Sequence, residues 1–209
     1  MFKAILLLVA IILLIIILLA IWLGLFDKID INMSRFKGGT LIYIENQCSY
    51  NQLSGQFEKL ISQTRPYFKE EERELCGLYF DNPNSIKDSF MSRSAIGILI
   101  DPSNDELEAR AREFVSRRPN YKAVNLPEVN CFVSRLEYKC FLSVFLFSRI
   151  WNALSLRVEK EGFRFVVSPP GIEVYNENNG KWESTEFFYP VEGDLADYII
   201  SSYPKPQSK

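Results

Sequence analysis

The stretch Cys76-Gly-Leu-Tyr-Phe-Asp-Asn-Pro83 joins a short apolar run to an abrupt stop. Apolar and aromatic residues in such a short run are typical of a buried strand. The stop has a physical cause, because Asp81 and Asn82 side chains bond to nearby backbone groups and Pro83 fixes its own φ. We therefore predict a strand over 76–80 and a turn directly after it.

The segments around this strand complete a β-α-β-β unit. Thr40-Leu-Ile-Tyr-Ile-Glu45 is rich in β-branched and aromatic residues, which predicts a strand. Apolar residues then recur at helical spacing until Pro66 ends the pattern. These residues are Leu53, Phe57, Leu60 and Ile61. Ala95-Ile-Gly-Ile-Leu-Ile100 predicts the last strand of the unit, which Asp101-Pro102 stops.

The second half of the chain repeats this order. Residues 130–138 alternate as a strand does, and residues 140–161 carry apolar side chains in phase over a long helix. Strands at 172–175 and 182–189 follow, joined by the hairpin turn Asn178-Asn-Gly180. The predicted fold is therefore α+β, with two β-α-β-β repeats whose helices lie on a mainly antiparallel sheet.

A further helix and a short strand are predicted between the repeats. Ser103 and Glu106 form a capping-box pattern at the start of the helix, and Pro119 follows its end. Residues 121–126 predict the strand.

Residues 4–26 contain no charged side chain and predict a helix that crosses a membrane. Such a helix is roughly 34 Å long, against a hydrocarbon core of about 30 Å. The alternative is a cleaved signal peptide, but the apolar run is too long and Leu23-Gly-Leu-Phe-Asp27 is a poor cleavage site. We expect an uncleaved anchor whose partner is the lipid bilayer. The predicted organisation is an anchor over 1–27, a linker over 28–38, a domain over 39–192 and a tail over 193–209.

The flanks of the anchor predict on which side the domain lies. Lys3 precedes the span, whereas Lys28, Arg35 and Lys37 follow it, and this excess favours a cytosolic domain. The cysteines lack CxxC spacing, so we expect them to be reduced; two disulfides are the alternative if the domain is lumenal. They are Cys48, Cys76, Cys131 and Cys140.

Charge and composition argue against several classes of function. The formal net charge is −2 and no basic run exceeds Arg117-Arg118, so direct nucleic-acid binding is not expected. The chain has no histidine, which removes Ser-His and Cys-His nucleophile pairs and the usual zinc sites. We expect a protein that is not an enzyme and has no cofactor or metal.

Two segments resemble a known fold family. Gly77-Leu-Tyr-Phe-Asp-Asn-Pro83 is similar to the Tyr-Tyr-Asp-Asn-Pro turn of GyrI-like domains, and Glu186-Phe-Phe-Tyr-Pro-Val191 is similar to their closing strand. With the anchor and the helix within Ser143–Gly162, the chain resembles the testis-expressed protein 264 family over roughly residues 1–195.

The resemblance implies an endoplasmic-reticulum membrane protein that acts as an adaptor in selective autophagy of that organelle. In this family a tail motif, aromatic-x-x-aliphatic, adds as a strand to a ubiquitin-like autophagy modifier. The resemblance also implies an adaptor for the AAA+ segregase in DNA–protein crosslink repair. The length of the span leaves the plasma membrane open as an alternative.

The chain departs from the family at the motif itself. Tyr198-Ile-Ile is followed by Ser201 where the motif needs an aliphatic residue. Phe57…Leu60 and Tyr121…Val124 match the motif elsewhere, but both lie in elements whose apolar residues should face the core.

The resemblance also implies an alternative function, a module that binds cationic aromatic ligands in a groove between the repeats. Glu186 matches the carboxylate at the base of that groove, and a cation would be attracted by its charge and by aromatic faces. The other candidate lining residues are Trp182, Tyr79, Tyr175 and Trp151. The competing interpretation is an exposed glutamate on an edge strand, with the aromatic side chains in the core.

Overall fold

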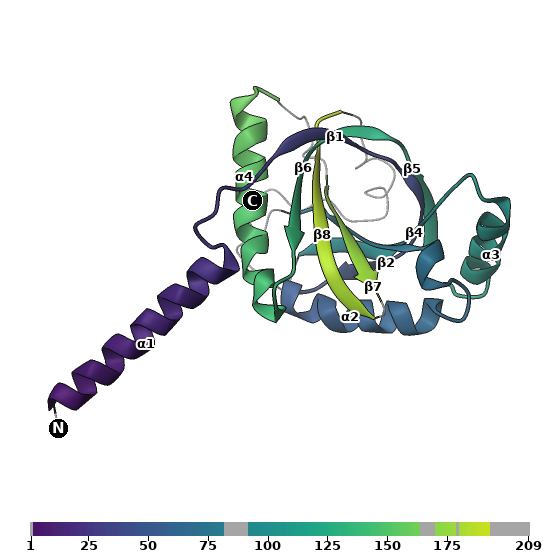
Figure 1. Ribbon diagram of the computed structural model, residues 1–209. Helices are drawn as coiled ribbons and strands as arrows, with labels where there is room; N and C mark the ends of the chain where they lie inside the picture. The colour runs from purple at the N-terminus through teal and green to yellow at the C-terminus, as the bar shows by residue number, and fades with distance from the viewer. Residues whose placement is uncertain (1, 82–91, 164–169, 179, 193–209) are drawn as a thin grey trace, which may run out of the picture.

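The computed structural model describes residues 2–81, 92–163, 170–178 and 180–192 (Figure 1). The helices are α1 (Phe2–Leu23), α2 (Tyr50–Thr64), α3 (Asp105–Ser116) and α4 (Phe147–Lys160), with 3-10 turns η1 (Glu70–Glu72) and η3 (Phe141–Leu146). The strands are β1 (Asn32–Phe36), β2 (Gly39–Gln47), β3 (Glu74–Tyr79), β4 (Arg93–Ile100), β5 (Lys122–Leu126), β6 (Val129–Glu137), β7 (Gly171–Asn178) and β8 (Lys181–Pro190).

The strands form one antiparallel sheet in the order β1-β6-β8-β7-β3-β4-β2-β5. The units β2-α2-β3-β4 and β6-α4-β7-β8 are the two predicted repeats, and they meet where β3 pairs with β7. This confirms the predicted α+β fold with two β-α-β-β repeats on an antiparallel sheet. The junction of the repeats therefore lies in the middle of the sheet.

Each repeat is preceded by a strand that pairs with the other repeat. β1 pairs with β6, and β5 pairs with β2. β1 lies inside the segment 28–38 assigned above to a linker, so the sheet extends into that segment. The sequence gives little sign of this strand, because only Phe36 of its side chains is buried. Gly38 links β1 to β2 with a φ of 71°, a conformation that glycine adopts easily.

The sheet curls so that both of its faces are covered (Figure 1). On β2, Leu41 belongs to the core on the inner face and Ile42 to the core beneath the helices, as strand alternation requires. α2 and α3 cover the first repeat, where Phe114 is fully buried. α4 covers the second repeat, where Leu154 is fully buried.

Two helix starts differ from the predictions. The side chain of Asn104, not Ser103, caps α3 by accepting a hydrogen bond of 3.2 Å from the backbone N–H of Leu107. Ser103 instead bonds to the Asp101 carboxylate in a tight turn. The helix predicted over 140–161 is divided into η3 and α4, and the hydroxyl of Ser143 accepts the backbone N–H of Lys139 at the start of η3.

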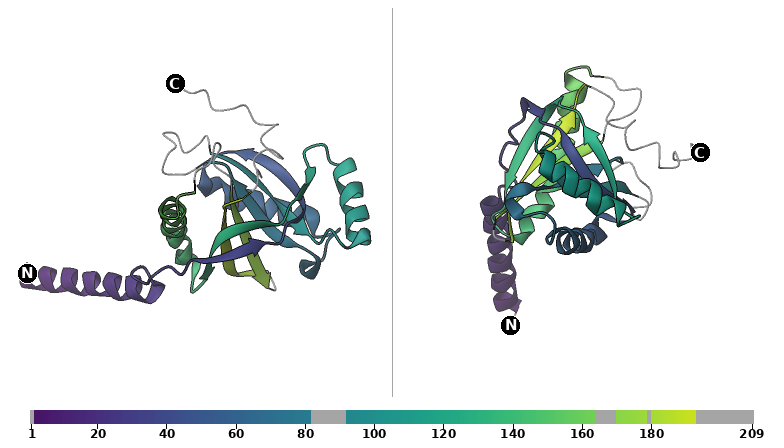
Figure 2. Two further views of the ribbon diagram at one scale, coloured as in Figure 1. Left: turned by 90° about the horizontal axis from the view of Figure 1, so that it is seen from above. Right: turned by 90° about the vertical axis from the view of Figure 1, so that its right-hand side faces the viewer.

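α1 projects away from the sheet domain in the three views (Figures 1 and 2). Its side chains are exposed nearly throughout, and it is long and apolar enough to cross a membrane. Its C-terminal end, in contrast, is bound to the domain. Lys139 Nζ donates to the Trp22 carbonyl oxygen at 2.6 Å, and Arg149 Nη1 donates to the Gly24 carbonyl oxygen at 3.0 Å.

The close approach of β2 and β4 yields a stability prediction at Gly97. A Cβ atom at this position would lie 2.2 Å from the carbonyl oxygen of Ile42, so Gly97→Ala must displace backbone. We expect a loss of about 1–3 kcal/mol in the free energy of unfolding, seen as a Tm lowered by several degrees in detergent micelles.

Gly55→Ala is the matched control. Gly55 lies within α2, and a Cβ there would meet no atom within 4 Å. Alanine favours a helix interior by about 1 kcal/mol over glycine, so the Tm should stay or rise. Equal Tm changes in the two variants would contradict the packing described here.

Candidate functional site

A cavity of about 1170 Å³ lies between α2 and α4, over the junction of the two repeats. Aromatic rings form much of its wall, and we call it the aromatic cavity. The aromatic residues lining it are Phe57, Tyr79, Phe80, Tyr138, Phe145, Phe147, Trp151, Tyr175, Trp182 and Tyr189. Both repeats contribute, because Phe57 and Tyr79 come from the first and Trp151 and Tyr175 from the second.

Strand alternation on β7 directs two polar side chains into the cavity. Ile172 and Val174 belong to the core on the inner face, whereas Glu173 and Tyr175 line the cavity on the helix-covered face. Gly171 makes room beside them, since a Cβ there would lie 2.4 Å from the ring of Trp151.

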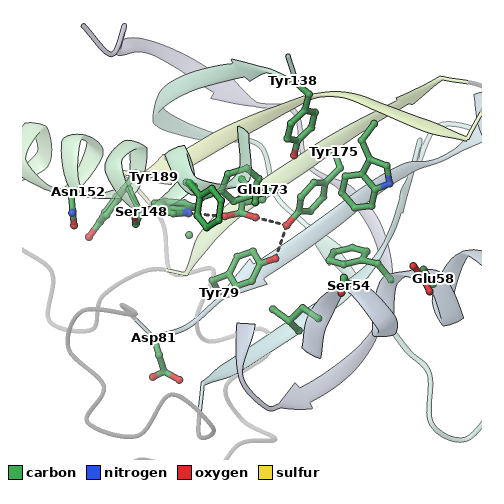
Figure 3. A pocket seen from close by; sticks show the side chains of 18 of the residues that line it. Ser54, Glu58, Tyr79, Asp81, Tyr138, Ser148, Asn152, Glu173, Tyr175 and Tyr189 are labelled. Carbon is green, nitrogen blue, oxygen red and sulfur yellow. Dashed lines mark hydrogen bonds between the residues drawn. The ribbon is translucent and has the colours of Figure 1, made fainter. Parts of the chain in front are cut away.

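Glu173 lines the aromatic cavity, and the residue is 4% exposed. Trp151 Nε1 donates to Glu173 Oε1 at 2.6 Å, and the hydroxyl of Tyr175 donates to Oε2. The hydroxyls of Tyr79 and Tyr175 lie 2.6 Å apart. Because Tyr175 gives its proton to Glu173, Tyr79 must be the donor in this pair, so the bonds run in series (Figure 3).

Burial and hydrogen bonding act in opposite directions on the charge of Glu173. Desolvation raises its pKa to about 7, although the hydrogen bonds from Tyr175 and Trp151 lower it. Among the described residues no Lys or Arg forms an ion pair with Glu173. The carboxylate is therefore close to half-ionised at neutral pH, and a cation in the cavity would favour its charged form.

Two other charged residues that line the cavity, Asp81 and Lys139, have partners, whereas Glu58 and Lys181 are exposed to solvent. Asp81 forms an ion pair of 2.7 Å with Arg93 and also accepts that residue's backbone N–H, which ties the end of β3 to β4. Lys139 donates to the end of α1. The buried charge available to a ligand is thus that of Glu173.

The structure brings most of the predicted ligand-binding residues together. Tyr79, Tyr175, Trp151 and Trp182 all line the aromatic cavity. Tyr175 also makes edge-to-face contacts with Trp182 and Phe57, whose ring centroids lie 4.8 Å and 5.0 Å away. These rings are therefore both packed and cavity-facing.

Glu186, in contrast, does not line the cavity. Its neighbour Phe187 points toward α4, so alternation on β8 turns Glu186 to the other face of the sheet, where it pairs with Arg135 at 3.4 Å. The assignment of the cavity carboxylate is corrected from Glu186 to Glu173. The edge-strand alternative is also corrected, since β8 lies between β6 and β7.

The two internal matches to the docking motif do not present their side chains on the surface. Phe57 and Leu60 both lie on the buried face of α2, where Phe57 is 4% exposed and Leu60 is fully buried. Tyr121 is buried and bonds to Gln63, and Val124 is half-buried against the inner core. The tail segment 198–201 lies outside the described residues.

Metal ligands are not gathered in the described part of the chain. No group of three or more Cys, Asp or Glu side chains there is placed to hold a metal ion. All four cysteines are free thiols. The cavity instead offers aromatic faces, hydroxyls and one buried carboxylate, a set suited to holding an organic molecule.

Comparison with known proteins identifies the fold. No family model and no curated protein matches the chain. The C-terminal domain of EcmrR is similar in structure with a TM-score of 0.54 at 11% identity, over 78% of this chain and 98% of that one. SAV2435, solved bound to tetraphenylphosphonium, is similar with a TM-score of 0.50 at 12% identity, over 78% of this chain and 94% of that one. The chain therefore has the fold of GyrI-like domains, while the narrower resemblance to the testis-expressed protein 264 family stays a prediction.

The raised pKa of Glu173 predicts how stability depends on pH. Between its ordinary value of 4.5 and about 7, the folded chain keeps a proton that the unfolded chain releases. The free energy of unfolding contributed by Glu173 should therefore be highest below pH 4.5 and fall by on the order of 3 kcal/mol as pH rises to 7. Denaturant unfolding of the full chain in micelles measures this fall.

Glu173→Gln should remove this part of the pH dependence. A glutamine oxygen can accept from Trp151, and its amide can donate to Tyr175, so the variant should fold. Glu186→Gln is the control and should keep the fall, because Glu186 lies on the other face. If the free energies of unfolding of wild type and Glu173→Gln changed with pH in the same way, the assignment of this pH dependence to Glu173 would be refuted.

Proposed function

We propose that this chain is a membrane-anchored module that binds a lipophilic aromatic cation in the aromatic cavity. The observation that carries the proposal is the carboxylate of Glu173, buried among aromatic rings and, within the described residues, without a cationic partner. The proposed role of the site is binding, with no chemical step assigned to it.

The chemistry of the cavity selects the ligand. A cation restores the charge interaction that Glu173 loses by burial, and the faces of Trp151 and Tyr175 attract positive charge through their quadrupoles. Flat apolar substituents match the remaining aromatic wall. The volume, about 1170 Å³, is slightly larger than the roughly 300–1,000 Å³ of ordinary small-molecule sites, so the cavity has room for a bulky ligand.

The similar structures support the choice of ligand class only through the fold. SAV2435 is bound to tetraphenylphosphonium, a lipophilic aromatic cation. This compound is therefore a suitable probe for the cavity of this chain.

The anchor belongs to the proposal because α1 is long and apolar enough to cross a membrane. The endoplasmic reticulum and a cytosolic domain stay predictions from the sequence. The autophagy and segregase adaptor roles also stay predictions; no contact or surface described above favours them over ligand binding.

Tetraphenylphosphonium titration in detergent micelles tests the proposal. We expect Glu173→Gln to weaken binding at pH 8 by tenfold or more, since the buried counter-charge is lost. Glu186→Gln, which removes a carboxylate from the opposite face, should bind as wild type does. Calorimetry with protein-free micelles as the blank provides the measurement, and unchanged affinity in Glu173→Gln would contradict the proposal.

Trp151→Phe separates the charge of Glu173 from the shape of the cavity. The variant keeps a ring but removes the N–H that donates to Glu173, so the pKa of Glu173 should rise. Wild-type affinity for the cation should fall as pH drops through 7, and in Trp151→Phe the midpoint should move to higher pH. A midpoint that does not move would show that Glu173 does not set the pH dependence.

A further inference from the structure

The end of α1 is held by basic side chains of the domain. Lys139 bonds to the carbonyl of Trp22, and Arg149 bonds to the carbonyls of Gly24 and Asp27. Carbonyl groups at a helix C-terminus carry negative partial charge and lack partners within the helix, so cations are favoured there. The domain thus lies directly on the end of the predicted span, not on a free linker.

Between these two basic residues lies an exposed apolar pair. η3 carries Val144, 50% exposed, and Phe145, 68% exposed. Outside residues 1–26, these are the only described large apolar residues that are both exposed and adjacent in sequence. Long basic side chains flanking an apolar tip are an arrangement typical of the surface of a membrane.

The same pair forms the edge of the aromatic cavity. Val144 and Phe145 line the cavity together with Lys139 and Ser148. A side chain that lines a cavity and yet is largely exposed lies at its opening. The part of the opening formed by η3 is therefore the part next to the end of α1.

We propose that Val144 and Phe145 insert into the surface of the bilayer that α1 crosses, so that the aromatic cavity opens at the membrane and receives its ligand from it. The bilayer is the partner proposed for this apolar surface because the surface lies next to the predicted span: Lys139 and Arg149, on either side of η3, bind the end of α1. The inference rests on the proposed function and narrows its ligand to cations that partition into lipid.

Quenching of tryptophan fluorescence by brominated lipid tests the insertion. The full chain is reconstituted in phosphatidylcholine vesicles, with and without lipids brominated on the part of the acyl chain nearest the headgroup. Phe145→Trp should add fluorescence that the brominated lipid quenches strongly, beyond the quenching of the parent chain, which contains Trp22, Trp151 and Trp182.

Leu156→Trp is the matched control. Leu156 is 65% exposed on α4, does not line the cavity, and lies further along the helix than Arg149, which binds α1. Its added fluorescence should be quenched little. Equal quenching of the two variants, or none in Phe145→Trp, would overturn the insertion.

Entry of the ligand from the membrane is tested by the rate of binding in a variant that lacks the exposed ring of Phe145. In Phe145→Ser, tetraphenylphosphonium supplied in vesicles should bind several-fold more slowly than in wild type. Because Phe145 also lines the cavity, this slowing should exceed any change in the affinity measured in micelles. Equal rates would overturn entry through this edge.

The two proposals fail in different ways. If wild type binds tetraphenylphosphonium in micelles but Phe145→Trp is not quenched, the inference fails and the proposed function stands. If Phe145→Trp is quenched but wild type binds no cation in micelles, the ligand class fails and the insertion stands.

Discussion

The buried carboxylate of Glu173 accepts hydrogen bonds from Trp151 and Tyr175. Among the described residues, no Lys or Arg forms an ion pair with it. Burial disfavours its charge and the donors favour it, so its pKa lies near 7. A proton or a cation in the cavity therefore decides its state. The role proposed for the chain and its expected pH dependence both follow from this balance.

The duplicated fold explains why such a group can exist at this position. The repeats meet where β3 pairs with β7, so a side chain on β7 lies far from both sheet edges and beneath the gap between α2 and α4. The same gap is edged by η3, whose neighbours Lys139 and Arg149 bind the end of α1. The cavity that contains Glu173 therefore has one edge next to the end of the predicted membrane span.

Much of the fold could be predicted from the sequence, because β-branched runs, Pro stops and helical periodicity are local signals. β1 could not, since its side chains are mostly exposed and its pairing with β6 is long-range. Four aromatic residues of the site, Tyr79, Trp151, Tyr175 and Trp182, are predicted from the sequence. The cavity carboxylate is assigned there to Glu186, and Glu173 is missed. Alternation within Ile172-Glu-Val-Tyr175 does place Glu173 and Tyr175 on one face; which face the helices cover depends on pairing that no local pattern contains.

Titration of the Glu173 side-chain carboxyl by carbon-13 NMR, in the full chain with and without tetraphenylphosphonium, tests the central claim most directly. The account predicts a pKa near 7 for the free protein and a value well below that when the cation is bound. A carboxyl that titrates near 4.5 in the free protein, or whose pKa does not respond to the cation, would contradict it.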